Sequence, residues 1–208
     1  MKTQIFCDIA EIKLIKQFTK KNIVKGFTTN PSLMRKAGAK NYESYSKKIL
    51  KICNTKPVSV EVFADDYKEI KKQAFKINSW GKNVFVKIPV VNSKGKFMGR
   101  VINELNKKNI KLNITAVYSY KNTEKILRSI NKKTEVIISI FAGRAADSGI
   151  DPIPELEKSI KIRKPDKINE VKQAMAPFTE IYSSKEGIEQ LIVYELQYFH
   201  LDLQFDHQ

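Results

Sequence analysis

Histidine, cysteine and tryptophan are all scarce in this chain of 208 residues. The two histidines, His200 and His207, stand at the C-terminal end, which argues against a Ser-His-Asp triad and against a His-rich metal site. The two cysteines, Cys7 and Cys53, form neither a CxxC pair nor a disulfide framework. We therefore expect two reduced, partly buried thiols and no cysteine-based metal site.

Long apolar runs are also missing, so the sequence predicts no transmembrane helix. The first ten residues run directly into a strand-like pattern and lack the apolar stretch of a signal peptide. We therefore expect a cytoplasmic protein. No linker, repeat or low-complexity segment divides the chain, and its length suits one domain over residues 1–208.

Acidic residues are few: the chain has 22 Asp and Glu against 38 Lys and Arg, which gives a net charge of +16. Such an excess can be the footprint of a nucleic-acid partner. However, only five of the cations are arginines, and no arginine-rich arm, zinc-finger spacing or aromatic RNA-binding signature accompanies them. A solvated lysine surface is the favoured interpretation, and that surface would also attract an anionic substrate.

Short runs rich in Val, Ile and Phe recur along the chain, as is typical of strands buried on both faces. Strands are expected at Gln4–Asp8, Lys25–Thr28, Val58–Phe63, Asn83–Ile88, Lys111–Thr115 and Glu135–Phe141, with weaker candidates at Glu170–Met175 and Leu191–Leu196. Amphipathic segments that predict helices lie between them, at Glu11–Asn22, Tyr42–Cys53, Asp66–Trp80, Phe97–Lys107 and Asn122–Asn131. Asp65 or Asp66 is the expected N-cap of the third helix.

The alternation of strands and helices favours an α/β fold with a parallel sheet. A Rossmann-like open sheet is one alternative, but no GxGxxG motif follows the first strand. The other alternative, a (β/α)8 TIM barrel, gathers the C-terminal ends of its strands around one mouth. Polar residues stand at the ends of the predicted strands, at Asp8, Thr28, Thr29, Asn30, Glu61, Lys87, Asn113, Thr115, Ser139 and Arg144. We therefore predict a single-domain barrel with its site at that mouth.

Lys87 is the most informative of these residues, because it ends a Val-Phe-Val strand and is followed by Ile-Pro. Burying an ammonium group is costly unless the group is paired or loses its proton. A neutral amine in such a place attacks a ketone and forms an iminium, an electron sink that permits C–C bond cleavage. The alternative is a lysine whose amine reaches the solvent at the rim of the sheet.

The neighbouring polar residues favour the catalytic alternative. Glu61 ends the preceding strand, where a carboxylate can handle protons directly or through water. Asp8 can orient hydroxyl groups or move protons from another side. Asn113 and Thr115 stand two residues apart on one strand, so their side chains face the same way. Taken singly, each polar residue also fits a satisfied strand end or helix cap; the set as a whole is harder to explain in that way.

At these residues the sequence resembles the transaldolase family, including its small fructose-6-phosphate aldolase-like members. The resembling segments are Thr28-Thr29-Asn30-Pro31-Ser32-Leu33, Val58-Ser59-Val60-Glu61-Val62, Val84-Phe85-Val86-Lys87-Ile88-Pro89, Leu112-Asn113-Ile114-Thr115 and Ser139-Ile140-Phe141-Ala142-Gly143-Arg144. They occur in the family's order within residues 4–151. The resemblance implies a (β/α)8 barrel and class I, Schiff-base chemistry that uses no metal and no organic cofactor.

The resemblance also implies a role for each residue. Lys87 would be the Schiff-base nucleophile, Glu61 and Thr115 would hold a catalytic water, and Asp8 would assist proton transfer. The substrate-binding residues would be Thr29, Asn30, Asn113, Ser139, Phe141 and Arg144, with Arg144 on the phosphate. The implied substrates are sugar phosphates of the pentose phosphate pathway: fructose 6-phosphate, sedoheptulose 7-phosphate, glyceraldehyde 3-phosphate and erythrose 4-phosphate. A homo-oligomer is expected.

Two residues favour a transaldolase over the simple aldolase branch of the family. That branch commonly carries Gln in place of Glu61 and Tyr in place of Phe141. The resemblance weakens over residues 152–208, where Pro177 and Thr179 replace a serine and an arginine that help bind phosphate in the family. Two alternatives therefore stay open: a fructose-6-phosphate aldolase-like enzyme, and a catalytically impaired basic barrel that binds nucleic acid or a protein.

Overall fold

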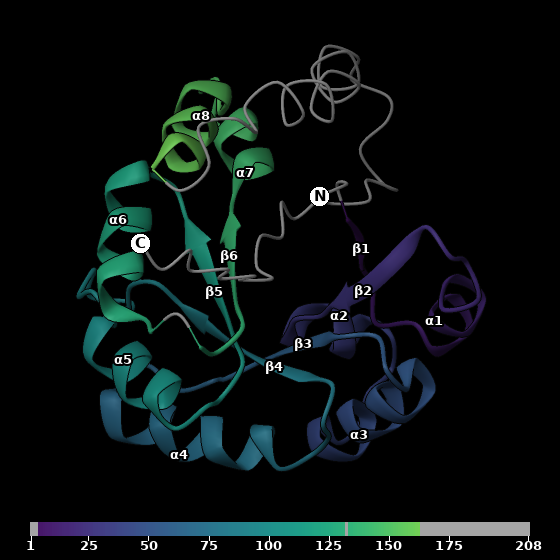
Figure 1. The fold of residues 1–208 in the computed structure, drawn as a ribbon. Coiled ribbons are helices and arrows are strands. Elements are labelled where there is room, and N and C mark those ends of the chain that lie inside the picture. The colour runs from purple at the N-terminus through teal and green to yellow at the C-terminus, as the bar shows by residue number, and fades with distance from the viewer. Residues whose placement is uncertain (1–3, 132, 163–208) are drawn as a thin grey trace, which may run out of the picture.

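The computed structural model describes residues 4–131 and 133–162, which form one curved parallel sheet with helices along its outer side (Figure 1). The sheet has six strands in the order β1-β2-β3-β4-β5-β6, and every neighbouring pair is parallel. The strands are β1 (Ile5–Asp8), β2 (Val24–Thr28), β3 (Val58–Glu61), β4 (Val84–Pro89), β5 (Leu112–Val117) and β6 (Val136–Ile140). All six strong strand predictions are confirmed to within two residues at each end.

A helix follows each strand, as the amphipathic segments predict. The helices are α1 (Ile12–Phe18), α2 (Pro31–Lys36), α3 (Tyr42–Cys53), α4 (Tyr67–Asn78), α5 (Gly99–Lys107), α6 (Tyr120–Ser129), α7 (Ala142–Asp147) and α8 (Ile153–Lys161). Three of them, α2, α7 and α8, were not predicted. Helices α2 and α7 have six residues each, too few to show the repeated apolar spacing on which the other predictions depend. Helix α8 has nine residues and buries Leu156 and Ile160, but no helix was predicted there.

The sequential strand order excludes the Rossmann alternative for the described residues. An open doubly wound sheet reverses its strand order near the middle, as in 3-2-1-4-5-6, whereas these strands add one after another in a single direction. The curl in Figure 1 is that of part of a (β/α)8 barrel. The weaker strand candidates Glu170–Met175 and Leu191–Leu196 lie outside the described residues, and closure of an eight-stranded barrel stays a prediction.

The two faces of the sheet differ in chemistry because successive side chains of a strand point to opposite faces. Val58, Val60 and Val86 belong to the buried hydrophobic cluster that packs beneath the helices. Ser59 and Lys87 alternate with them and therefore point to the concave inner face, where both are buried. The helices thus bury the apolar face of the sheet, and the polar residues are left to line its inner side.

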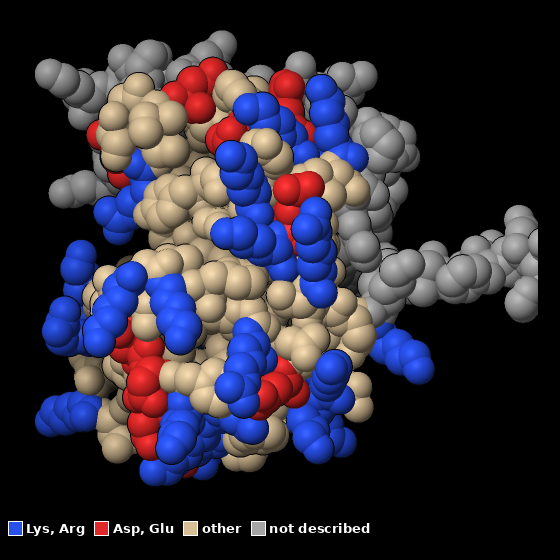
Figure 2. Space-filling view, turned by 90° about the vertical axis from the view of Figure 1, so that its left-hand side faces the viewer, with Lys and Arg blue, Asp and Glu red and all other residues tan. Residues whose placement is uncertain are grey.

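The basic surface is spread over exposed helix faces. Figure 2, which looks onto the left-hand side of Figure 1, shows Lys and Arg side chains interspersed with Asp and Glu. For example, Glu104 of α5 pairs with Lys71 of α4 at 2.8 Å and with Arg100 of its own helix at 3.3 Å. This pattern accords with a solvated lysine surface. Among the described helices, none is long and apolar enough to cross a membrane.

Candidate active site

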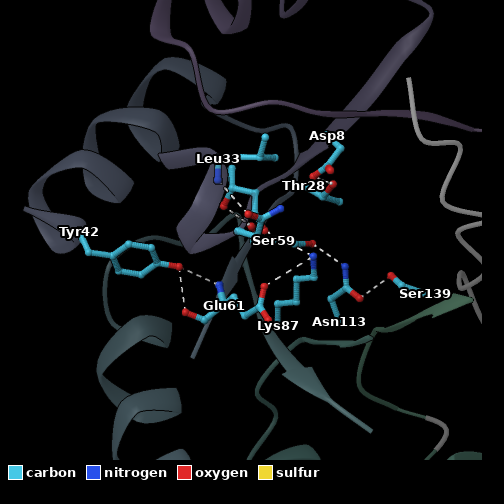
Figure 3. Close-up of polar contacts among 11 residues, drawn as sticks. Asp8, Thr28, Leu33, Tyr42, Ser59, Glu61, Lys87, Asn113 and Ser139 are labelled. Atoms are coloured by element: carbon cyan, nitrogen blue, oxygen red, sulfur yellow. Dashed lines mark hydrogen bonds and ion pairs between the residues drawn. The ribbon is translucent and has the colours of Figure 1, made fainter. Parts of the chain in front are cut away.

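Lys87 lies in the middle of a row of polar side chains on the inner face of the sheet (Figure 3). The strand register aligns it with Glu61 of β3 on one side and with Asn113 of β5 on the other. Aligned residues of parallel strands point the same way, so the three side chains share one face. Adjacent strands are about 4.8 Å apart, which brings neighbouring members of the row within reach of a small substrate.

The amine of Lys87 is buried, with only 5% of the residue exposed. Its Nζ lies 3.8 Å from Glu61 Oε2 and 3.5 Å from the backbone oxygen of Thr29. These contacts compensate part of the cost of burying a charge. They are also longer than the 2.7–2.9 Å of a strong charge-assisted hydrogen bond, so the amine is oriented without being tightly bound to either oxygen.

A chain of hydrogen bonds fixes the amide of Asn113. Ser139 Oγ of β6 donates to Asn113 Oδ1 at 2.6 Å, and Asn113 Nδ2 donates to Ser59 Oγ of β3 at 2.9 Å (Figure 3). All three residues are buried. Sequence analysis predicts Asn113 and Ser139 and misses Ser59. The signal for Ser59 was its position two residues before Glu61, which places both side chains on the same face of β3.

Asp8 enters the site from the end of β1. Thr28 Oγ1, on the neighbouring strand, donates to Asp8 Oδ1 at 2.8 Å. Burial raises the pKa of the Asp8 carboxyl above its usual range, and the positive charge of Lys87 and the Thr28 hydrogen bond oppose that shift. A raised pKa brings a carboxyl closer to neutral pH, where it is better suited to accept and return a proton during a reaction.

Thr115 has a buried hydroxyl without a hydrogen-bond partner among the described residues. It lies two residues beyond Asn113 on β5 and aligns with Pro89 of β4. The regular pairing of β5 breaks immediately afterwards, where Ala116 takes a positive φ of 57°. Buried hydroxyl groups are rarely left unpaired, and a bound water or a ligand usually satisfies them. This orphaned hydroxyl fits the expected role of holding a water molecule.

Thr29 and Asn30 each use a side-chain oxygen in a hydrogen bond to the backbone. Thr29 is fully buried, and its hydroxyl donates to the backbone oxygen of Ser59 at 2.8 Å. Asn30 Oδ1 accepts from the backbone N–H of Leu33 at 2.9 Å and thereby caps helix α2. The amide nitrogen of Asn30 is consequently the group that remains for a substrate. Direct contact between either residue and a substrate stays a prediction.

Phe141 and Arg144 follow the end of β6. Phe141 is the N-cap residue of α7, and its ring meets Tyr118 edge-on at 5.7 Å. Arg144 lies on α7, is exposed, and forms no ion pair with the residues that the structure describes. Within the described ranges, no hydrogen bond or ion pair joins the Arg144 side chain to the Lys87 row. Pro177 and Thr179, which replace the serine and arginine that help bind phosphate in the family, lie outside the described residues.

A hollow of about 660 Å³ lies at the opposite end of the sheet, where the strands begin. Lys25, Phe85 and Lys111 are among its lining residues, and none of the predicted site residues is. Active sites of parallel α/β folds form at the C-terminal ends of the strands. We therefore place the candidate site at Lys87 and not in this hollow.

Comparison with known proteins identifies the family of this chain. The family model described as Transaldolase/Fructose-6-phosphate aldolase matches residues 5–195. A "Probable transaldolase" of Dehalococcoides mccartyi is 34% identical over 161 residues, which cover 77% of this chain and 71% of that protein. A "Probable transaldolase" of Methanococcus vannielii is 34% identical over 161 residues, covering 76% and 69%. One of Methanococcus maripaludis is 36% identical over 148 residues, covering 71% and 64%. The chain belongs to the transaldolase/fructose-6-phosphate aldolase family.

Proposed function

We propose that the chain is a transaldolase, which transfers a dihydroxyacetone unit between sugar phosphates through a Schiff base on Lys87. One observation carries the proposal: the buried Lys87 amine lies 3.8 Å from the Glu61 carboxylate, and the register of the strands aligns both with Asn113. A nucleophile, an acid/base group and an amide donor thus meet in one row. Membership in the transaldolase/fructose-6-phosphate aldolase family supports Schiff-base chemistry at this lysine.

The proposed reaction begins when Lys87 Nζ adds to the C2 carbonyl of fructose 6-phosphate and water leaves to give an iminium. The C3–C4 bond then breaks, its electrons move into the iminium to give an enamine, and the C4 hydroxyl loses its proton. Glyceraldehyde 3-phosphate departs. The enamine attacks the aldehyde carbon of erythrose 4-phosphate, and hydrolysis of the new iminium frees Lys87 and sedoheptulose 7-phosphate. No atom is oxidised or reduced overall.

The neighbouring residues take roles that their positions support. Glu61 and Thr115 hold the water that leaves and returns as the iminium forms and hydrolyses, because each offers an oxygen on the inner face of the sheet. Asp8 accepts the C4 hydroxyl proton and returns it to the acceptor, which its raised pKa favours. The Asn113 amide, held by Ser59 and Ser139, hydrogen-bonds the intermediate. Asn30 and Arg144 bind hydroxyl and phosphate groups.

An aldolase that releases free dihydroxyacetone shares the first half of this reaction. Glu61 and Phe141 favour the transferase, since the aldolase-like members commonly carry Gln and Tyr in those places. The two activities separate in one assay. Fructose 6-phosphate with erythrose 4-phosphate should yield sedoheptulose 7-phosphate and glyceraldehyde 3-phosphate, whereas fructose 6-phosphate alone should release little dihydroxyacetone. Equal turnover with and without the acceptor would identify an aldolase and contradict the transferase.

A further inference from the structure

The backbone of Glu61 lies where the hydrogen bonding between β2 and β3 stops. The amides of Phe27 in β2 and of Thr29 just after it donate to the backbone oxygens of Pro57, just before β3, and of Ser59 in β3, at 2.8 and 3.1 Å. These bonds repeat every two residues along each strand, so the next one would join the amide of residue 31 to the oxygen of Glu61. Residue 31 is a proline, and proline has no backbone N–H to donate. The sheet itself therefore leaves the Glu61 oxygen without this partner.

Tyr42, the first residue of helix α3, occupies that missing position with its phenol. Tyr42 Oη donates to the backbone oxygen of Glu61 at 2.8 Å and accepts from the backbone N–H of Glu61 at 3.0 Å (Figure 3). One hydroxyl group thus bonds both polar backbone groups of the same residue. Because β3 ends at Glu61, this pair of bonds fixes the direction in which the strand leaves the sheet and the point from which the carboxylate projects.

The ring of Tyr42 is held in place independently of its hydroxyl. It meets the ring of Phe63 edge-on at 4.4 Å and the ring of Trp80 edge-on at 6.2 Å. Aromatic pairs in this geometry contribute beyond the area that they bury. Removing the hydroxyl alone should therefore leave the ring in its place and affect only the backbone of Glu61. Partial burial raises the pKa of the Tyr42 hydroxyl, so it stays protonated and able to donate.

We propose that Tyr42 is a positioning residue for the reaction, which sets the place of the Glu61 carboxylate by hydrogen-bonding the Glu61 backbone. The inference rests on the proposed function, because it assigns Tyr42 a task in the same site. The phenol also lets the chain turn away from the sheet at Pro31. The carbonyl of Thr29, which the regular ladder would pair with the Glu61 amide, is thereby left to face Lys87 Nζ at 3.5 Å. The two oxygens near Lys87 Nζ, from the Glu61 carboxylate and the Thr29 backbone, thus both depend on the hydrogen bonds of Tyr42.

The test compares two Tyr→Phe variants of the full chain. Tyr42→Phe removes the hydroxyl at Glu61. Tyr45→Phe is the matched control, because Tyr45 lies on the same helix and its hydroxyl bonds the backbone oxygens of Ala10 and Ala37 instead, at 3.0 and 3.3 Å. We expect Tyr42→Phe to lower kcat by about 10- to 100-fold, as misplacement of a catalytic group does, with little change in KM. Tyr45→Phe should leave kcat unchanged. Equal kcat values for the two variants would overturn the inference.

A double-mutant cycle separates positioning of Glu61 from a general effect on the fold. In a Glu61→Ala background the carboxylate is already absent, so Tyr42→Phe should lower kcat by much less than it does in the wild type. A loss as large as in the wild-type background would mean that Tyr42 acts independently of Glu61, which contradicts the inference. A wild-type protein with neither turnover nor a trapped Schiff base would overturn the proposed function and this inference together. That result differs from the outcomes above, which all compare variants with an active wild type.

Exchange of the Glu61 backbone amide with solvent gives a readout that does not depend on activity. In the wild type this amide donates to Tyr42 Oη. The Tyr42→Phe variant should exchange it faster, while the amide of Val62, which donates to the Lys87 backbone oxygen, should keep its rate. NMR exchange measurements on labelled protein follow both amides at once. An unchanged rate at Glu61 would show that the phenol does not hold this backbone, and would overturn the inference.

Discussion

The carboxyl of Asp8 lowers the stability of the folded protein when it is ionised. Its pKa in the folded protein is raised, chiefly by burial, so the folded state holds the Asp8 proton more tightly than the unfolded state does. Ionisation of Asp8 therefore costs stability. The cost is absent below the unfolded pKa of about 3.9, grows as the pH rises toward the folded value, and stays complete above it.

We predict that Asp8→Asn raises the free energy of unfolding at neutral pH, because the amide can accept the Thr28 hydrogen bond and carries no charge. The gain over the wild type should shrink as the pH falls toward 4, where Asp8 becomes protonated in both states. Urea unfolding of both proteins across this pH range measures the gain. The same variant should lose turnover. A gain that does not change with pH, or a loss of stability at pH 7, would contradict the account of Asp8.

Much of the site was predictable at this scale, because polar residues at the ends of apolar strands stand out. Lys87, Glu61 and Asn113 do lie in one row. Two contributors were missed. The position of Ser59, two residues before Glu61, places it on the site face, but its hydrogen bond to Asn113 depends on a strand register that the sequence does not state. Tyr42 fits the apolar face of a helix, and its ring does pack there; only the structure shows that its hydroxyl bonds Glu61.

Among the elements, helix α4 shows how a local signal sets a boundary. It begins after Asp66, whose Oδ1 accepts from the backbone N–H groups of Lys68 and Glu69 at 3.0 and 3.1 Å. The sequence left Asp65 and Asp66 as alternative caps. The structure selects Asp66, while Asp65 accepts hydrogen bonds from the backbone and side chain of Ser93 in the loop after β4. Of these two adjacent aspartates, Asp66 caps a helix and Asp65 connects two loops.

We predict that Asp66→Ala lowers the free energy of unfolding by about 1 kcal/mol, the usual cost of losing an N-cap. Asp66→Asn should cost much less, because asparagine caps helices about as well as aspartate does. Urea denaturation of the two variants beside the wild type measures the difference. If Asn and Ala were equally destabilising, the charge of Asp66 and not its capping bonds would be what stabilises the helix.

At the scale of the whole molecule, the net charge of +16 should act on substrate capture more than on folding. Exposed cations attract a phosphorylated donor over a distance that salt shortens to about 8 Å at physiological ionic strength. We predict that kcat/KM for fructose 6-phosphate falls as NaCl is added, while kcat/KM for free fructose changes little. Steady-state kinetics over a salt series give both values. A parallel response of the two sugars would show that the surface charge does not steer the phosphate.

The fold was predictable at this scale as far as the repeated strand–helix pattern extends. Six strong strands predicted a parallel sheet, and their order in space confirms an α/β sheet that curls as a partial barrel does. The segments predicted as the seventh and eighth strands have weak patterns, and they lie outside the described residues. The same stretch holds Pro177 and Thr179, at the positions where the family carries a serine and an arginine that help bind phosphate.

Borohydride reduction tests most directly whether Lys87 forms a Schiff base with a ketose. Wild-type protein, fructose 6-phosphate and borohydride should give one reduced adduct of a donor-derived fragment by intact mass, which peptide mapping assigns to Lys87. Lys87→Arg should give none, because a guanidinium stays protonated and forms no iminium. Lys111→Arg, which changes a lysine at the opposite end of the sheet, should keep the adduct. An adduct on another lysine, or no adduct with any ketose, would contradict the account.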